Sequence, residues 1–156
     1  MTDLIAFVGG GNMATSLIGG LIARGVPPAQ IVVADPEPSQ RARLERDHGV
    51  TTVADAPSAV ASAQTVVLAV KPQQMAQVAR SIAGLVAVRR PLVISVAAGI
   101  RLQDLARWLG PGVPLVRTMP NRPALIGAGI TALYAAPNVD APSRAAADRI
   151  LAACGP

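Results

Sequence analysis

Short apolar segments alternate with longer segments of helical periodicity along most of the chain. The apolar run at residues 4–8 is too short for a core helix and ends at three consecutive glycines, so we expect a buried strand there. In residues 12–24 the apolar positions recur at helical spacing, and Gly25 follows as a stop signal. The pattern therefore predicts a strand, a glycine-rich turn and a helix in direct succession.

The same alternation continues as far as residue 118. Further strands are expected at residues 31–34, 50–53, 65–70, 92–96 and 114–118. Helices are expected at residues 39–48, from about residue 55, at 73–85 and at 102–109. Strands joined through helices imply crossover connections, which produce a mostly parallel sheet covered on both faces. The fold class predicted is α/β, with a doubly wound, mostly parallel sheet.

The pattern changes after Pro120. Residues 127–135 are expected to add one more strand, and residues 141–153 a helix that stops at Gly155 and Pro156. We interpret residues 141–154 as a connecting helix. On that interpretation its apolar side, over residues 145–153, is exposed.

Composition narrows the possible functions. A chain of 156 residues suits one domain, and 51% hydrophobic against 15% charged residues excludes a disordered protein. Phe7, Trp108 and Tyr134 are the only aromatic residues, which argues against a surface for stacking bases. Subtracting 9 acidic from 14 basic residues gives a net charge of +5, spread along the chain, so we expect no nucleic-acid partner.

The number of cysteines and the lengths of the apolar runs indicate whether to expect a metal site, which cellular compartment to expect, and whether the protein enters a membrane. Cys154 is the single cysteine, without a partner for an internal disulfide or companions at metal-ligand spacing. We therefore expect no metal site and a cytoplasmic protein. No apolar run reaches the roughly 20 residues of a membrane span, so no membrane association is expected.

The turn between the first strand and helix fits the pattern Gly-x-Gly-x-x-Ala, as Gly9-Gly10-Gly11-Asn12-Met13-Ala14. The glycines permit a tight turn and let backbone approach a pyrophosphate, and the small last residue lets helix and strand pack closely. The anion would then lie on free N–H groups at the positive end of the helix. Glycine runs also form ordinary turns, so the pattern alone is a weak indicator.

Asp35 strengthens the prediction of a dinucleotide site. It ends the second expected strand, 35 − 14 = 21 residues beyond Ala14, where such folds place a carboxylate for the adenine ribose. An aspartate before Pro36 is also a good turn residue, so a structural role stays open. A carboxylate repels the extra phosphate of NADP, whereas Arg41 and Arg43 on the next helix are candidates to pair with it. NADPH and NADH both stay open as the cofactor.

Three further motifs, with residues 7–13, closely resemble pyrroline-5-carboxylate reductase in order and spacing across nearly the whole chain. They are Leu68-Ala69-Val70-Lys71-Pro72-Gln73, Ile94-Ser95-Val96-Ala97-Ala98-Gly99-Ile100 and Arg117-Thr118-Met119-Pro120-Asn121. The resemblance implies a Rossmann-type domain and NADPH- or NADH-dependent reduction of 1-pyrroline-5-carboxylate to L-proline. It is a reaction of proline biosynthesis.

The resemblance also implies which residues lie along the cofactor, all in turns at the carboxyl ends of strands. The implied cofactor-binding residues are Val8, Gly9, Gly10, Gly11, Asn12, Met13, Ala14, Asp35, Pro36, Ala69, Val70, Lys71, Pro72, Val96, Ala97 and Ala98. Met119, Pro120 and Asn121 are expected on the substrate side. Two departures from the family are Arg122, where threonine is common, and Ala56, where asparagine is frequent.

Four other residues have competing interpretations. Lys71 is either a charge partner for an anionic ligand or simply solvated. Arg117 either contacts an anion or anchors the turn at residues 119–121. His48, next to Gly49, is explained by a favourable interaction with the helix dipole. Cys154 is expected to pack as a small apolar residue. The proton donor and the catalytic residues are therefore unknown.

The family's substrate site is completed by a C-terminal helical dimerisation domain with a Ser-Pro-Gly-Gly-Thr-Thr-like loop, and no such loop occurs in these 156 residues. We therefore expect residues 1–156 to form a dinucleotide-binding domain that binds cofactor but turns over the imino acid weakly or not at all. Full-length family members are expected to be homo-oligomers through the absent domain. The alternatives are a free-standing NAD(P)-binding sensing or scaffolding module, or a hydroxyacid or phosphogluconate dehydrogenase type of enzyme.

Overall fold

The computed structural model describes residues 3–120, 129 and 131–155, whose strands form one seven-stranded sheet in the order β3-β2-β1-β4-β5-β6-β7. The strands are β1 (Ile5–Val8), β2 (Ile31–Ala34), β3 (Thr51–Val53), β4 (Thr65–Leu68), β5 (Leu92–Ser95), β6 (Leu115–Pro120) and β7 (Thr131–Ala135). Neighbouring strands from β3 to β6 pair in parallel, and β7 pairs with β6 in the antiparallel direction. The doubly wound, mostly parallel sheet predicted from the sequence is confirmed.

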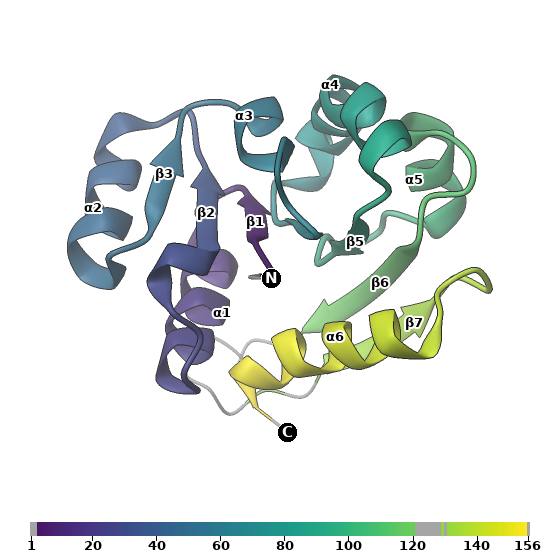
Figure 1. Ribbon diagram of the computed structural model, residues 1–156. Helices are drawn as coiled ribbons and strands as arrows, with labels where there is room; N and C mark the ends of the chain where they lie inside the picture. The colour runs from purple at the N-terminus through teal and green to yellow at the C-terminus, as the bar shows by residue number, and fades with distance from the viewer. Residues whose placement is uncertain (1–2, 121–128, 130, 156) are drawn as a thin grey trace.

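Helices cover both faces of this sheet (Figure 1). They are α1 (Asn12–Ala23), η1 (Pro28–Gln30), α2 (Pro38–His48), α3 (Ala56–Val60), α4 (Pro72–Arg89), α5 (Leu102–Leu109), α6 (Ala141–Leu151) and η3 (Ala152–Cys154). The first face carries α1, α2 and α6, and the second carries α3, α4 and α5. No helix in the described part of the chain is long and apolar enough to cross a membrane.

Each central strand contributes side chains to both cores. In β1, Ile5 and Phe7 lie in the core beneath α1, whereas Ala6 and Val8 lie in the core beneath α3 to α5. All four residues are buried, which explains why the strand is a continuous apolar run without alternation. Phe7 is fully buried, and full burial of such a side chain contributes about 1.5–3 kcal/mol. The cores are otherwise almost entirely aliphatic.

The apolar side of α6 is buried, and the expectation that it is exposed is wrong. Ala147 is 0% exposed, Ile150 and Leu151 are each 5% exposed, and Cys154 in the following η3 turn is 2% exposed. These residues share a core with Phe7 because antiparallel β7 turns the chain back toward the α1 face. Cys154 packs as a small apolar residue, as expected, and burial raises the pKa of its thiol.

Glycine is required where α1 meets the η3 turn. A Cβ atom placed on Gly20 would collide with the carbonyl oxygen of Ala153 and also lie 2.8 Å from its carbonyl carbon. The atoms that this Cβ would meet belong to the backbone of Ala153. A change of side-chain rotamer therefore cannot relieve the collision. The last described segment of the chain is therefore fixed by a backbone contact with the first helix.

Several element boundaries differ from those expected. Strand β4 ends at Leu68, so Ala69 and Val70 lie beyond it, and β6 continues to Pro120. Helix α4 runs to Arg89 because Val86 is buried one helical turn after Ile82. The expected strand at residues 127–135 is described as β7 from Thr131, and its earlier residues, except Gly129, lie outside the described residues.

The contact between α1 and η3 predicts opposite effects for two adjacent glycines. Gly20→Ala should lower the free energy of unfolding by about 1–3 kcal/mol, the usual range for overpacking against a fixed neighbour. Gly19→Ala is the matched control, because the one described side chain that its added Cβ would meet is the His48 ring, with Cε1 at 3.4 Å, while helix propensity improves by up to about 1 kcal/mol. Urea denaturation measures both, and a Gly20→Ala protein as stable as the Gly19→Ala protein would contradict the packing described.

Candidate functional site

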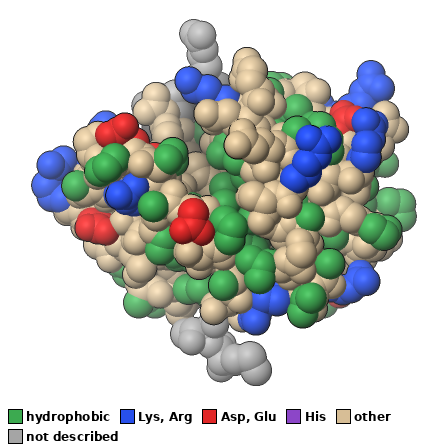
Figure 2. Space-filling view, turned by 90° about the horizontal axis from the view of Figure 1, so that it is seen from above, with side chains coloured by type: hydrophobic (Ala, Val, Ile, Leu, Met, Phe, Trp, Pro, Cys, Tyr) green, Lys and Arg blue, Asp and Glu red, His purple; other side chains and the backbone are tan. Residues whose placement is uncertain are grey.

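The segments singled out in the sequence meet at one edge of the sheet, where β1, β2, β4, β5 and β6 have their carboxyl ends. The arrowheads of β1, β2 and β3 point to the top of Figure 1, and Figure 2 views the molecule from that side. The helices that follow neighbouring strands β1 and β4 lie on opposite faces of the sheet. Ligands of open α/β sheets bind at such a switch point.

Backbone hydrogen bonds keep the turns at this edge in register. The N–H of Gly9 donates to Ala34 O at 2.8 Å, and the N–H of Ala69 donates to Val8 O at 2.8 Å. The N–H of Val96 donates to Leu68 O at 3.1 Å. The turns that follow β1, β4 and β5 therefore start side by side, each bonded to its neighbouring strand.

The three glycines after β1 are constrained differently. Gly9 has a φ of +100°, and a Cβ there would lie 2.7 Å from Ala69 O. A Cβ on Gly10 would lie 2.8 Å from Leu44 Cδ1. Among the residues that the structure describes, a Cβ on Gly11 would have no neighbour within 4 Å. A side chain at Gly9 would meet fixed backbone, and one at Gly10 would have to displace buried Leu44, whereas no described residue lies beside a Cβ on Gly11.

This third glycine stands at the start of α1. Gly11 is the N-cap residue of α1, and no side chain caps the helix there. The first N–H groups of a helix need partners from outside it, and the helix dipole makes this end positive. The arrangement fits an anion such as a diphosphate, since Gly11 and Asn12 are exposed and no described residue lies within 4 Å of a Cβ placed on Gly11.

Asp35 is bonded to the glycine turn by its side chain. Its Oδ2 accepts the Gly10 N–H at 3.0 Å, and its Oδ1 accepts the Glu37 N–H at 2.9 Å. The structural role that the sequence left open is therefore present. The carboxylate stands at the carboxyl end of β2 and is half-buried, in the position expected for a residue beside the ribose.

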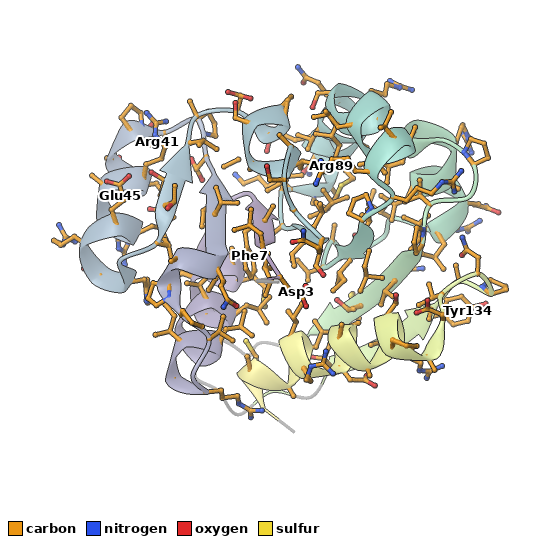
Figure 3. The ribbon with its side chains drawn as sticks, in the orientation of Figure 1. Asp3, Phe7, Arg41, Glu45, Arg89 and Tyr134 are labelled. Atoms are coloured by element: carbon orange, nitrogen blue, oxygen red, sulfur yellow. The ribbon has the colours of Figure 1, made fainter. Side chains whose placement is uncertain are left out.

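Of the two candidate arginines, Arg41 lies at this edge. Its Nη1 donates to Asp35 O at 2.8 Å, and Figure 3 shows it near the upper end of α2. Arg43 Nε instead lies 3.8 Å from Asp47 Oδ2 in an exposed pair, which is a weak interaction. Figure 2 shows the Lys and Arg side chains of this view dispersed, mainly around its rim.

Gln40 is a contact residue that sequence reasoning missed. Its Nε2 donates to the carbonyl oxygen of Gly10, 30 residues earlier in the chain. A glutamine on a polar helix carries no local signal of such a contact. The one sequence signal for this contact is that Gln40 lies four residues before Leu44 and so on the same face of the helix. Leu44 is the buried residue of α2 and packs against the same turn.

The turn after β4 is accessible. Ala69 and Val70 are half-buried, whereas Lys71 and Pro72 are exposed at the start of α4. Lys71 is the N-cap residue of that helix, and its side chain makes no cap hydrogen bond. The backbone of this turn therefore lies open along the edge.

The turn after β5 is more closed. Ala97 is 5% exposed and its side chain belongs to the core beneath α3 to α5, while Val96 is half-buried and Ala98 exposed. Ser95 Oγ accepts the Ala97 N–H at 3.3 Å, and Thr118 Oγ1 donates to Ser95 O at 3.0 Å. The Thr118 hydroxyl joins the ends of β5 and β6, and the Ser95 hydroxyl fixes the turn after β5. Sequence reasoning did not single out either hydroxyl as part of the site.

The expected substrate side is described in part. Met119 is 49% exposed at the end of β6, and Asn121 and Arg122 lie outside the described residues. Arg117, Arg101, Met119 and exposed Tyr134 are among the residues that line an open depression of about 500 Å³ between α5 and the β6–β7 pair. In Figure 3, Tyr134 lies at the opposite end of the molecule from Arg41. The two interpretations of Arg117 both stay open.

Two titratable residues of interest have roles outside the site: His48 lies away from it and Asp55 caps a helix. His48 is the last residue of α2, whose first turn is at the carboxyl edge, so it lies toward the opposite edge. Asp55 caps α3 next to half-buried Ala56, and hydrogen bonds from the N–H and hydroxyl of Ser58 hold the pKa of that carboxyl below its usual value. Within the described residues, no three His, Cys, Asp or Glu side chains gather to hold a metal ion.

Comparisons with known proteins bear on this site. Pyrroline-5-carboxylate reductase of Pseudomonas aeruginosa is 46% identical over 154 residues, covering 99% of this chain and 56% of that protein. A solved pyrroline-5-carboxylate reductase structure from Coxiella burnetii superposes with a TM-score of 0.97 at 37% identity, covering 99% of this chain and 57% of the other. The resemblance drawn from the sequence is confirmed over the region that the chain covers.

A third comparison shows the same fold in a protein of lower sequence identity. The Plasmodium falciparum pyrroline carboxylate reductase structure with NADP bound has a TM-score of 0.84 at 21% identity, covers 98% of this chain and 55% of that one, and shows the shared fold. The chain spans about half the length of the curated relatives it matches. Residues 4–99 match the model of a protein family described as NADP oxidoreductase, coenzyme F420-dependent. The chain therefore belongs to this NADP oxidoreductase family.

Proposed function

We propose that this chain is the NAD(P)H-binding part of a reductase that converts 1-pyrroline-5-carboxylate to L-proline. The observation that carries the proposal is the glycine turn at the start of α1, where no described residue lies within 4 Å of a Cβ on Gly11 at the switch point of the sheet. The substrate is supported by the similarity to relatives named pyrroline-5-carboxylate reductase. The NADP of the Plasmodium falciparum structure supports the cofactor class.

The cofactor is proposed to lie along the carboxyl edge in three parts. Its diphosphate lies on the turn and first helical residues from Gly9 to Ala14, where N–H groups and the helix dipole favour an anion. Its adenosine lies by Asp35 and Pro36, with Arg41 beside any 2′-phosphate. Its nicotinamide end lies by the turns after β4 and β5, whose proposed residues are Ala69, Val70, Lys71, Pro72, Val96, Ala97 and Ala98.

When bound, the reduced nicotinamide supplies the hydride that is added to the C=N carbon. The contribution of this chain is orientation, since it holds donor and acceptor in line at a fixed edge. The hydroxyl of Thr118 is buried and already donates to Ser95 O, and Ser95 is 0% exposed, so neither is offered as a proton donor. A protonated C=N attracts hydride by itself, and we propose that the ring nitrogen takes its proton from water.

The substrate is proposed to lie at Met119 and Pro120, the last two residues of β6, and at Asn121. We also propose that the enzyme is cytoplasmic, and that full-length family members are homo-oligomers through a C-terminal helical domain that completes the substrate site. Residues 1–156 are then a dinucleotide-binding domain, with α6 packed onto its first core.

The activity is tested by following NADPH oxidation at increasing concentrations of 1-pyrroline-5-carboxylate, with the longest natural form of the protein that contains residues 1–156. Proline should form in equal amount to the NADPH oxidised. A 3-hydroxy acid with NADP serves as the comparison substrate. Turnover of the hydroxy acid without any reduction of the imino acid would overturn the proposed substrate, while cofactor binding without turnover of either would favour a sensing or scaffolding module.

Gly11→Asp should abolish most cofactor binding without harming the fold. Gly11 has a φ of −76°, a Cβ there meets no described residue within 4 Å, and Asp is a preferred N-cap residue, so stability should be kept or raised. A carboxylate at this position repels a diphosphate, and the Kd for NADPH should rise by about tenfold or more. Gly11→Asn adds a side chain of similar size without charge, so its Kd for NADPH should rise less than that of Gly11→Asp. Equal NADPH affinities for the Asp variant and the wild type, measured by calorimetry, would place the diphosphate elsewhere.

Arg41→Met should weaken NADPH binding more than NADH binding. Arg41 is the basic residue held at the end of β2, and a charge-assisted bond to the 2′-phosphate is worth about 1.5–3 kcal/mol, or roughly tenfold in affinity. The Kd for NADH should change about twofold or less. Arg43→Met removes the same charge from an exposed pair on the same helix and is the control. Equal losses for both cofactors would show that Arg41 has no role in recognising the phosphate.

A further inference from the structure

The backbone on both sides of Gly10 is held by side chains from the β2–α2 region. The peptide that precedes Gly10 is held through its N–H, which donates to Asp35 Oδ2 at 3.0 Å. The peptide that follows is held through its carbonyl oxygen, which accepts from Gln40 Nε2. Thr15 Oγ1 reaches the same oxygen at a long 3.5 Å but makes its shorter bond, 2.8 Å, to Gly11 O. Gln40 is therefore the principal side-chain partner of this carbonyl.

The direction of that carbonyl sets the direction of the next N–H group. Gly10 O and the Gly11 N–H belong to one trans peptide, in which C=O and N–H point in opposite directions. Because the oxygen points to Gln40 on α2, the Gly11 N–H points away from α2. A glycine peptide is otherwise free to rotate, since no Cβ restricts it.

Gln40 is held in place by the packing of its own helix. It lies on the same face of α2 as Leu44, four residues later. Leu44 is 1% exposed and packs against the turn, so a Cβ on Gly10 would come within 2.8 Å of its Cδ1. The amide of Gln40 is thus carried to the Gly10 carbonyl by a helix that the core fixes independently.

We propose that Gln40 is a positioning residue for the diphosphate, aiming the Gly11 N–H by holding the Gly10 carbonyl on the opposite side of the peptide. This inference rests on the proposed cofactor site. It gives the β2–α2 region a role besides recognising the adenosine ribose: Asp35 and Gln40 together fix the two peptides from which the phosphate-binding turn is built.

The test compares Gln40→Met with wild type and with Gln77→Met, the same change at an exposed position of α4. Methionine keeps the length of the side chain but cannot donate a hydrogen bond. The Kd for NADPH and for ADP-ribose should rise roughly threefold to tenfold in Gln40→Met, the effect of one lost hydrogen bond, and stay unchanged in Gln77→Met. Gln40→Lys, which can donate to the same carbonyl, should restore most of the affinity.

A ligand without a diphosphate separates positioning from general damage. Adenosine 2′-monophosphate should bind wild type and Gln40→Met equally, because it does not reach the glycine turn. Equal weakening of this ligand and of NADPH would contradict the proposal, as would unchanged NADPH binding in Gln40→Met. If wild type binds neither NADPH nor ADP-ribose, the proposed function fails; if wild type binds and Gln40→Met binds as well, only the role of Gln40 fails.

Discussion

The close approach of the β1 turn to its neighbours is the constraint on which the rest of the site depends. A Cβ on Gly9 would collide with the backbone that leaves β4, and a Cβ on Gly10 would press on buried Leu44 of α2, so both positions favour glycine. This contact brings the amino end of α1 to the middle of the carboxyl edge. A helix terminus buried without partners is unfavourable, whereas one that opens on solvent beside Gly11 can receive an anion.

Two hydrophobic cores, one on each face of the sheet, hold that edge in place. The first joins Phe7 and the apolar side of α1 to the end of α6, and the second joins Val8 to α4 and α5. The last segment of the chain supports the first helix through the contact of Ala153 with Gly20. The cofactor site is thus formed by the turns that follow neighbouring strands β2, β1, β4 and β5. Its rigidity comes from the cores on both faces of the sheet and from the packing of Ala153 against α1.

The sequence correctly predicted those elements whose conformation is determined by neighbouring residues in the chain. The run at residues 4–8, the glycine turn and the spacing of apolar positions after it each follow from neighbouring residues, and the structure has them in that order. The burial of Ile150 and Leu151 could not be predicted the same way, because it depends on the antiparallel return of β7. Gln40 was missed for a similar reason, since its partner is 30 residues away and its helix is otherwise polar. Asp35 lies directly after β2, where the sequence predicted the end of a strand, but its bond to the Gly10 N–H depends on how β1 and β2 pair.

The central claim is that the free N–H groups at the start of α1 bind the diphosphate of a nicotinamide dinucleotide. Amide chemical shifts of the ¹⁵N-labelled chain, followed during titration with NADPH, test it most directly. The amides of Gly11, Asn12 and Met13 should shift most, with smaller changes at Asp35 and Ala69 and none near His48 or Gln64 on the opposite edge. Saturable binding that leaves those three amides unmoved would contradict it.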